Sequence, residues 1–378
     1  VIPRFWTMKG KRVERLWGWD AHGLTVENRV QENLGIKKRR DIENYGLDKF
    51  TQACYEYTSK ISAEWKWYID KIGRWVDFDN AYRTTNQTYM ESVMWAFKQI
   101  YEKGLIYEGI RTSLFCPTCG TPVSDFEIAM DNSYREENDP SITVKFRVVT
   151  DGDFKDHYLL AWTTTPWTLP SNRALVIDDK ETYVSVFYEN ENYILAKKRL
   201  DSVFPEKNYE VKKEFPGKEL LGLQYNPLFK YYSSKENEFK VYTYEGMVTM
   251  EEGTGIVHSA PGFGEIDTEM GRYYDLTLMM TLDDEGKMLP GTYEKNPYEG
   301  VFYLEANQQI LNELLERGVI FKNERVTHRV PYHDRCNTLL VQKAQKSWFI
   351  DIQKIKKELI KNNEEINWVP EYVKKGIF

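Results

Sequence analysis

The sequence has little of what secreted, membrane-spanning or strongly basic proteins need. Four cysteines in 378 residues are too few for the disulfide framework of a secreted domain. No apolar run approaches the roughly 18 residues that cross a bilayer, which argues against membrane insertion. A net charge of −7 argues against an extended nucleic-acid-binding surface. The content of 41% hydrophobic and 29% charged residues is typical of a globular protein.

The positive charge of the chain is concentrated near its start, which weakens the argument against nucleic-acid binding. Residues 1–40 hold ten lysine or arginine residues against four acidic ones, a local charge of +6 that leaves −13 for the rest. A nucleic-acid contact therefore stays open for this segment. At roughly 100–200 residues per domain, the length predicts two or three domains. The chain begins at Val1 without a Met or a secretory leader, so we expect an excised segment of a longer, cytoplasmic protein.

Hydrophobic periodicity divides the chain into helical ends and a β-rich middle. Apolar residues at spacings of three and four predict helices over 50–72 and 90–101, whose aromatic side chains we expect to pack in a core. Helices return at 306–317 and after Trp348. Between them, short β-branched or aromatic runs predict strands at 142–148, 158–163, 174–178, 183–188, 193–196, 239–248 and 255–258. This order predicts an α/β protein with a β-rich domain inserted into a loop of another domain.

Two cysteine knuckles flank the β-rich part. Cys116 and Cys119 form a C-x-x-C turn, and His333 and Cys336 are the other candidate ligands at comparable spacing. Three thiolates and one imidazole suit Zn²⁺ and leave no open coordination position, so we predict a structural site. The alternative is a redox pair. It is less favoured because prolines at 117 and 122 bracket a turn where a thioredoxin-like motif would begin a helix.

A threonine-rich segment follows the predicted strand at 158–163. Thr163, Thr164 and Thr165 end that strand, and prolines at 166 and 170 prevent strand or helix from continuing. The hydroxyls are therefore presented on a rigid bend, where they can donate to or accept from a ribose, a phosphate or an ester. The alternative is an ordinary strand and turn, since threonine is a good strand former.

A glycine-rich segment at 252–267 contains one histidine and one aspartate of interest. Its glycine spacing matches neither a dinucleotide-binding nor a phosphate-binding loop. His258 ends a predicted strand, and Asp267 follows after a Gly/Pro turn that could fold both into one pocket. Since a single histidine is more often structural than catalytic, spacing alone does not decide its role.

Together, these two segments resemble the editing domain of isoleucyl-tRNA synthetases. In that family a Trp-Thr-Thr-Thr-Pro-Trp-Thr-Leu-Pro-x-Asn segment faces a Gly-Thr-Gly-x-Val-His-x-Ala-Pro-x-x-Gly-x-x-Asp segment. The resemblance extends to residues 3–10, 18–24 and 347–349 and to both knuckles, although His333 stands where the family usually has Cys. Leucyl and valyl relatives usually carry Arg at the position of Thr165, which favours the isoleucine enzymes.

The resemblance implies a division into three segments. Residues 1–139 would be part of a Rossmann-type class I catalytic domain with a helical connection, residues 140–325 a barrel-like editing domain with flanking helices, and residues 326–378 the return segment. The His-Ile-Gly-His and Lys-Met-Ser-Lys-Ser motifs do not occur here. ATP and Mg²⁺ would therefore serve only the full-length parent enzyme, which ligates isoleucine to tRNA(Ile).

The resemblance also implies an activity. A binding pocket discriminates poorly against one missing methylene, and the isoleucine enzyme is the standard example of a synthetase that hydrolyses the smaller, wrong product at a second site. The chain would bind, as a monomer, the acceptor end of tRNA(Ile) carrying valine and hydrolyse that ester with a positioned water. The alternatives are a tRNA-docking module without turnover and a valyl or leucyl editing domain.

Residue roles follow from the family pattern. Asp267 would bind the α-ammonium group, and His258 would close the side-chain pocket against isoleucine. The remaining expected catalytic residues are Thr163, Thr164 and Thr165. The expected substrate-binding residues are Trp162, Thr168, Asn172, Ala260, Pro261, Gly264 and, in the remnant of the aminoacyl-adenylate pocket, Asp20.

Overall fold

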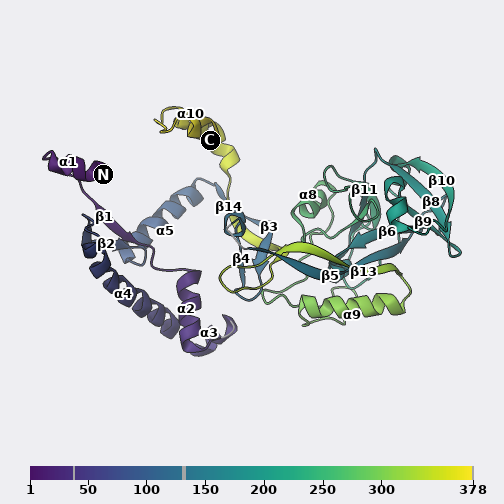
Figure 1. Cartoon of the computed structure of the whole chain (residues 1–378), viewed down its shortest axis with the longest axis horizontal. Coiled ribbons are helices and arrows are strands. Elements are labelled where there is room, and N and C mark those ends of the chain that lie inside the picture. Colours follow the sequence, from purple (N-terminus) through teal and green to yellow (C-terminus); the bar gives the residue numbers. More distant parts are fainter. Residues whose placement is uncertain (37–38, 130–132, 377–378) are drawn as a thin grey trace. The chain divides into compact units, whose positions relative to one another are not determined.

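The computed structural model describes residues 1–36, 39–129 and 133–376 (Figure 1). The chain forms two compact units. We call Val1–Gly109 with Lys346–Phe378 the flanking unit, and Ile110–Gln345 the inserted unit. The chain thus leaves the flanking unit once, completes the inserted unit and returns. Among the described residues, no helix has the length and apolarity that crossing a membrane requires.

The flanking unit is mainly helical. Its two short strands, β1 and β2, pair in parallel, and Val30, Ile42 and Phe50 form its small core. The predicted helix at 50–72 corresponds to α4, and the one at 90–101 to α5, which ends before Gly104, where φ is +66°. The elements are α1 (Ile2–Met8), β1 (Leu16–Trp19), α2 (Leu24–Leu34), α3 (Arg39–Tyr45), α4 (Leu47–Lys71), β2 (Asp77–Arg83), α5 (Gln87–Glu102), α10 (Ile352–Glu364) and α11 (Tyr372–Gly376).

The aromatic side chains of α4 and α5 do not form the core that we predict. Trp67 and Trp95 are 70% and 65% exposed, and no described residue of α5 is buried. The apolar stripes have the predicted spacing, but a stripe is buried only where another apolar element covers it. Within the described part of this unit, the buried cluster consists of one residue each from α2, α3 and α4, and none from α5. The prediction of core packing was therefore wrong for α5.

The inserted unit is built on a nine-stranded mixed sheet, so the chain is a mixed α/β protein. Along the sheet the strand order is β10-β8-β9-β6-β12-β7-β11, and β5 pairs with both β6 and β13. Each of the seven predicted strands has a counterpart in this sheet, although the one predicted over 239–248 is a strand only at Lys240–Thr243. Its members are β5 (Tyr134–Arg147), β6 (Tyr158–Thr163), β7 (Ala174–Ile177), β8 (Thr182–Tyr188), β9 (Glu191–Ala196), β10 (Glu210–Pro216), β11 (Lys240–Thr243), β12 (Ile256–Ser259) and β13 (Ile320–Pro331).

Helices cover both faces of the sheet near its centre. Leu175 and Ile177 of β7 join a core with Ile310 of helix α9 (Tyr303–Glu316). Ala174 and Val176, which alternate with them, pack with Met270 of helix α8 (Glu265–Tyr273). Because successive side chains of a strand point to opposite faces, β7 is buried on both sides. Leu315, which we place in the apolar stripe of α9, is 47% exposed, so that stripe is narrower than predicted.

Several smaller elements lie outside the large sheet. A three-stranded sheet has the order β14-β3-β4, and a 3-10 helix, η1, joins β6 to β7. The remaining elements are β3 (Ile106–Cys116), β4 (Thr121–Pro122), α6 (Asp125–Ile128), η1 (Pro166–Ser171), η2 (Lys197–Arg199), α7 (Leu200–Val203), η3 (Gly217–Leu220) and β14 (Val341–Ile350).

Candidate functional site

The threonine-rich and glycine-rich segments lie on neighbouring strands. Strand β12 pairs in parallel with β6, with Val257 opposite Trp162, and antiparallel with β7, with His258 opposite Leu175. The prolines at 166 and 170 end β6 and form η1, which returns the chain to β7 within a few residues. The bend that we predict from these prolines therefore lies beside His258.

A chain of hydroxyl groups connects the two segments. The Thr168 hydroxyl lies 2.8 Å from Nε2 of His258 and donates to the carbonyl oxygen of Thr165 at 2.9 Å. The Thr165 hydroxyl lies 3.2 Å from that of Thr168 and 3.3 Å from that of Thr163. Thr163 and Thr168 are buried, whereas Thr164 and Thr165 are half-buried. Thr164 and Thr165 are thus the threonines of the bend that a ligand can reach.

His258 is a neutral, fully partnered imidazole. Its Nδ1 lies 3.1 Å from the amide nitrogen of Asn172, and its Nε2 faces Thr168. Burial lowers the pKa of His258 to about 4, because charging a desolvated imidazole is unfavourable. The ring is therefore uncharged at neutral pH.

Asp267 is held beside this network by the residues that follow His258. Its Oδ1 accepts hydrogen bonds from the Ser259 hydroxyl at 2.8 Å and from the Ala260 main-chain N–H at 3.0 Å. Asp267 lies in the first turn of α8, where a helix favours negative charge. Burial raises the pKa of Asp267, and the Ser259 and Ala260 hydrogen bonds oppose that rise. A side chain at Gly264 would overlap the Asp267 carboxylate.

The other expected binding residues are placed as follows. Trp162 is half-buried on β6 against Gly253, which has φ +65° and whose Cβ would lie 3.2 Å from the Trp162 side chain. Ala260 and Pro261 form the turn between β12 and α8 and are buried. Asp20, in contrast, is an exposed residue that follows β1 in the flanking unit.

Three residues of this region carry no motif signal in the sequence. The buried Tyr225 donates from its hydroxyl to Oδ1 of Asn172 at 2.7 Å. Arg173 forms a buried ion pair with Glu238 at 3.3 Å, and also donates to the main-chain oxygen of Asn172 at 3.2 Å. Burial lowers the pKa of Arg173, and Glu238 opposes this. The sequence analysis missed Tyr225, Arg173 and Glu238. They lie far along the chain from their partners or belong to no recognised motif, so no periodicity or spacing marks them.

The two knuckles meet in the inserted unit. One ligand atom from each of Cys116, Cys119, His333 and Cys336 lies within 4.8 Å of the others. Sγ of Cys116 and Sγ of Cys336 are 3.4 Å apart, and Nδ1 of His333 is 3.6 Å from Sγ of Cys119 and 3.2 Å from Sγ of Cys336. Tetrahedral zinc with bonds of about 2.0–2.3 Å separates neighbouring ligand atoms by roughly 3.3–3.8 Å. The cluster could therefore hold a metal ion.

The protonation of the cluster favours a cation as well. Hydrogen bonds with Cys116 and Cys119 lower the pKa of Cys336, while hydrogen bonds with Cys116 and Cys336 raise the pKa of Cys119. A bound cation would compensate the negative charge of the thiolates. His333 presents Nδ1 to the sulfurs. Among the described atoms, its Nε2 has no hydrogen-bond partner and lies 3.8 Å from Oδ1 of Asp334.

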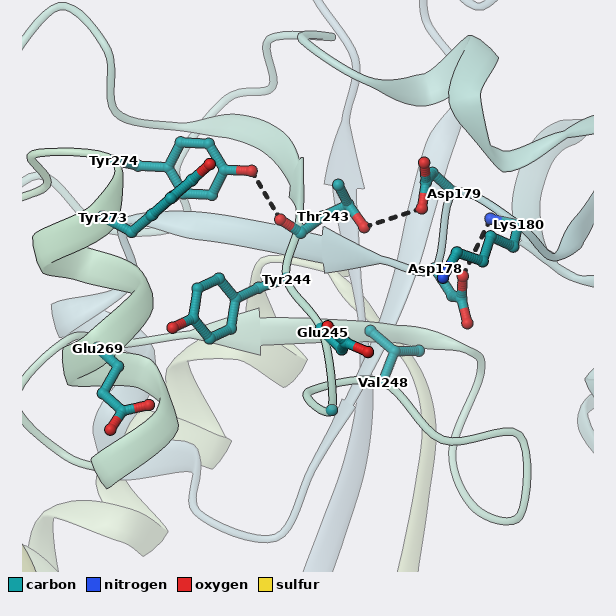
Figure 2. Close-up of a pocket in the computed structure, with 11 residues that line it drawn as sticks. Asp178, Asp179, Lys180, Thr243, Tyr244, Glu245, Val248, Glu269, Tyr273 and Tyr274 are labelled. Carbon is teal, nitrogen blue, oxygen red and sulfur yellow. Dashed lines mark hydrogen bonds between the residues drawn. The ribbon is translucent and has the colours of Figure 1, made fainter.

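A separate pocket of about 770 Å³ opens near the ends of β7 and β11 (Figure 2). The Tyr274 hydroxyl donates to the main-chain oxygen of Thr243 at 2.7 Å, and the Thr243 hydroxyl donates to Asp179 at 3.3 Å. Four carboxylates against one lysine make the pocket acidic, so it would repel a phosphate. Among the described residues, none of those expected in the functional site lines it. The lining residues are Asp178, Asp179, Lys180, Thr243, Tyr244, Glu245, Gly246, Val248, Glu269, Tyr273 and Tyr274.

Solved structures with a related arrangement are distant. The cytosolic leucyl-tRNA synthetase editing domain of P. falciparum is 12% identical with a TM-score of 0.37, covering 49% of this chain and 99% of that chain. The corresponding P. knowlesi domain is 14% identical with a TM-score of 0.35, covering 52% and 99%. With such low identities and TM-scores, we infer nothing about function from these structures.

Sequence relatives are much closer. An isoleucine-tRNA ligase of Treponema denticola is 40% identical over 409 aligned residues, and one of Clostridium novyi is 42% identical over 378. Each match covers all of this chain, but only 37% and 36% of the relative. The chain thus spans little more than a third of the length of these curated relatives. The family model of tRNA synthetases class I (I, L, M and V) matches residues 1–378, so the chain belongs to that family.

Proposed function

We propose that the inserted unit carries an editing site that hydrolyses the ester of valyl-tRNA(Ile). The observation that carries the proposal is the hydrogen-bonded network of Thr163, Thr165, Thr168 and His258, with Asp267 held beside it. Segments 90 residues apart supply neutral hydroxyls, a neutral imidazole and one carboxylate. These groups match the parts of an aminoacyl ester, namely a ribose, an ester carbonyl and an ammonium group.

Asp267 would bind the α-ammonium group of the bound amino acid. The hydrogen bonds from Ser259 and Ala260 hold the carboxylate in one orientation. A positive ligand favours the ionised form and so offsets the effect of burial on the Asp267 pKa. A charge-assisted contact of this kind also rejects substrates without a free amino group.

The threonines would hold the terminal adenosine and the ester without adding charge. The more accessible hydroxyls are those of the half-buried Thr164 and Thr165, with Trp162 nearby on β6. The buried Thr163 and Thr168 contact the Thr165 hydroxyl. A water positioned among these groups would attack the ester carbonyl, and the bond from that carbon to the ribose oxygen would break. The ribose oxygen would take up the proton lost by the water, which releases valine and tRNA(Ile). The rate would be gained mainly from orientation and fixed dipoles.

His258 would exclude isoleucine sterically and would not take part in proton transfer. Both ring nitrogens have protein partners, and burial keeps the ring neutral. The ring is therefore a poor acceptor for the proton of the attacking water. Its edge would close the side-chain pocket, so that isoleucine, one methylene larger than valine, does not fit.

The metal cluster would be a structural zinc site. Cys116 ends β3 and His333 follows β13, so one ion held with Cys119 and Cys336 would join the first and last segments of the inserted unit. A four-ligand zinc site has no open position and supplies folding energy, not reaction chemistry.

The proposal extends to the longer protein. Residues 1–139, 140–325 and 326–378 would be a partial Rossmann-type catalytic segment, the editing domain and the return segment. The whole enzyme would be a cytoplasmic, monomeric ligase that joins isoleucine to tRNA(Ile) with ATP and Mg²⁺. Asp20 would belong to the amino-acid pocket of that ligase and would not act on its own here.

A docking role without turnover is the second candidate. The observation that favours it is the excess of positive residues among the first 40. One of them, Arg12, has a highly exposed side chain, although it forms an ion pair with Glu14. Lys37 and Lys38, part of the predicted basic segment, lie outside the described residues. Such binding would weaken steeply with salt.

One experiment separates the two candidates. The 378-residue chain is mixed with valyl-tRNA(Ile), and both complex formation and valine release are followed. The editing proposal predicts release well above the uncatalysed rate. Binding with an ester that persists as long as in buffer would refute editing and favour docking.

A further inference from the structure

Tyr225, Asn172 and His258 form a chain of hydrogen bonds. At each contact of this chain, only one of the two groups can be the donor. We propose that Tyr225 and Asn172 hold His258 as the tautomer protonated at Nε2, and that Tyr225 is a positioning residue of the threonine network. The consequence for ester cleavage rests on the function proposed above. The tautomer itself does not, because it follows from contacts within the chain.

The orientation of the Asn172 amide is fixed by its surroundings. Its nitrogen donates to the main-chain oxygen of Ala174 at 2.9 Å and lies 3.4 Å from that of Ser259. Its oxygen faces the Tyr225 hydroxyl at 2.7 Å. Exchanging nitrogen and oxygen would turn the amide oxygen toward two carbonyl oxygens, which cannot donate.

This orientation determines the tautomer of His258. The amide nitrogen of Asn172, a donor, lies 3.1 Å from Nδ1, so Nδ1 must accept. The ring proton is then on Nε2, which donates to the Thr168 hydroxyl oxygen at 2.8 Å. Thr168 gives its own proton to the carbonyl oxygen of Thr165 at 2.9 Å. The donors and acceptors of the chain are thereby all assigned.

Tyr225 is well suited to anchor the chain. It is 1% exposed, and its ring packs edge-on against Phe146 and Phe239 at centroid distances of 5.2 and 6.2 Å. Its main-chain N–H donates to the oxygen of Phe239 at 3.0 Å. Burial raises the pKa of Tyr225 well above its ordinary value, so the hydroxyl keeps its proton. Among the described atoms, it is the one donor that faces Oδ1 of Asn172.

The tautomer has a consequence for the threonine segment. Because Thr168 accepts from His258 and donates to the Thr165 main chain, its proton is not available to the Thr165 hydroxyl 3.2 Å away. The Thr165 hydroxyl must donate in that contact. It must then accept in its 3.3 Å contact with the Thr163 hydroxyl. One lone pair of the Thr165 hydroxyl remains to accept from a ligand hydroxyl, an ammonium group or a water proton.

The tautomer can be measured directly in the 378-residue chain. Histidine labelled with ¹⁵N and read by long-range ¹H–¹⁵N correlation shows which ring nitrogen carries the proton. The chain has five histidines, and the signal missing from His258→Gln identifies His258. We expect Nε2 protonated and Nδ1 unprotonated. A proton on Nδ1, or a mixture of both forms, would overturn the proposal without any tRNA or further variant.

Two variants test the residues that set the tautomer. Tyr225→Phe leaves Oδ1 of Asn172 without its donor, so we expect the Nδ1-protonated form to become measurable and kcat for valyl-ester cleavage to fall more than KM changes. Asn172→Asp places an acceptor against Nδ1 of His258, so we expect the ring proton of His258 to move from Nε2 to Nδ1. An unchanged His258 signal in Tyr225→Phe would refute the role of Tyr225, and an unprotonated Nδ1 in Asn172→Asp would refute that of Asn172.

A matched control is Tyr232→Phe. Tyr232 is also buried, and its hydroxyl accepts from the side-chain amide of Asn296 at 3.1 Å, outside the network. We expect this variant to leave the tautomer of His258 unchanged. If it shifts the tautomer as Tyr225→Phe does, general loosening of the core explains the effect and the proposal fails.

Discussion

The Thr168 hydroxyl lies 2.8 Å from Nε2 of His258, a contact that joins the threonine-rich bend to the glycine-rich segment. Each segment alone has an ordinary structural explanation: a strand that ends in a turn, and a histidine on a strand. Brought together on β6, η1 and β12, they form one buried polar network. Such a network is costly to leave partly satisfied, so removing single members should have measurable effects.

Asp267→Asn should greatly reduce valyl-ester cleavage. The amide has nearly the same shape and can still accept from Ser259, but it lacks the charge that would bind the ammonium group. Loss of a charge-assisted hydrogen bond costs about 1.5–3 kcal/mol, or roughly 10- to 100-fold in rate. Single-turnover release of valine from valyl-tRNA(Ile) measures it. Asp179→Asn, outside the site, is the control, and full activity of Asp267→Asn would remove the assigned role.

His258→Ala should relax specificity more than it reduces rate. Removing the ring enlarges the pocket where the extra methylene of isoleucine would otherwise clash, so cleavage of isoleucyl-tRNA(Ile) should appear. One methylene is worth about 1–3 kcal/mol of discrimination, or roughly 10- to 200-fold. The measurement is the ratio of the two cleavage rates, with His157→Ala as control. A variant that still spares the isoleucyl ester would show that another residue sets the size limit.

Folding stability should depend on pH through His258. Its folded pKa of about 4 lies below the ordinary 6.5, so the unfolded chain binds the proton more readily. The stabilising effect is complete above about pH 6.5 and is lost as pH falls toward 4, by about 3 kcal/mol. Urea unfolding of the chain and of His258→Gln at several pH values measures the difference. The effect of Asp267, whose raised pKa acts in the opposite direction, is common to both proteins. Parallel pH curves would contradict the assignment.

The cluster of Cys116, Cys119, His333 and Cys336 should bind one zinc ion per chain. A chelator should lower Tm by roughly 5–10 °C, because the ion binds the folded state alone. His333→Cys replaces one ligand by another and should keep the ion, whereas His333→Ala should weaken binding. Elemental analysis and thermal unfolding with and without chelator test this. Cys54→Ala is the control, since Cys54 lies in α4 of the flanking unit. A chain without zinc and with unchanged Tm would refute the site.

The sequence predicts those parts of the fold that carry local patterns. Strands such as β6 and β7, with β-branched or aromatic runs between turn residues, lie where we place them. Strands β10 and β13 were missed because charged or polar residues interrupt their apolar ones and most of their residues are exposed or half-buried. The glycine-rich segment predicts only a turn before Asp267, yet Asp267 lies in the first turn of helix α8, which is stabilised by packing of Met270 against β7.

In the candidate site, too, the residues within recognisable motifs could be predicted, whereas those defined by tertiary contacts could not. The resemblance of two motifs to a known family singles out His258 and the threonines, since spacing alone left them undecided. Ligand chemistry identifies the four residues of the metal cluster, which the fold brings together. Tyr225 could not be found this way, because its contact with Asn172 spans 53 residues and depends on the tertiary structure alone. The roles of all these residues in catalysis and binding stay predictions.

The proposed editing site should cleave the smaller ester and spare the larger one. Its most direct test is the single-turnover cleavage of valyl-tRNA(Ile) and isoleucyl-tRNA(Ile) by the same 378-residue chain under the same conditions. We expect valine to be released at least roughly tenfold faster than isoleucine, since one methylene can discriminate by that much. Equal persistence of both esters, at the rate seen in buffer, would contradict it.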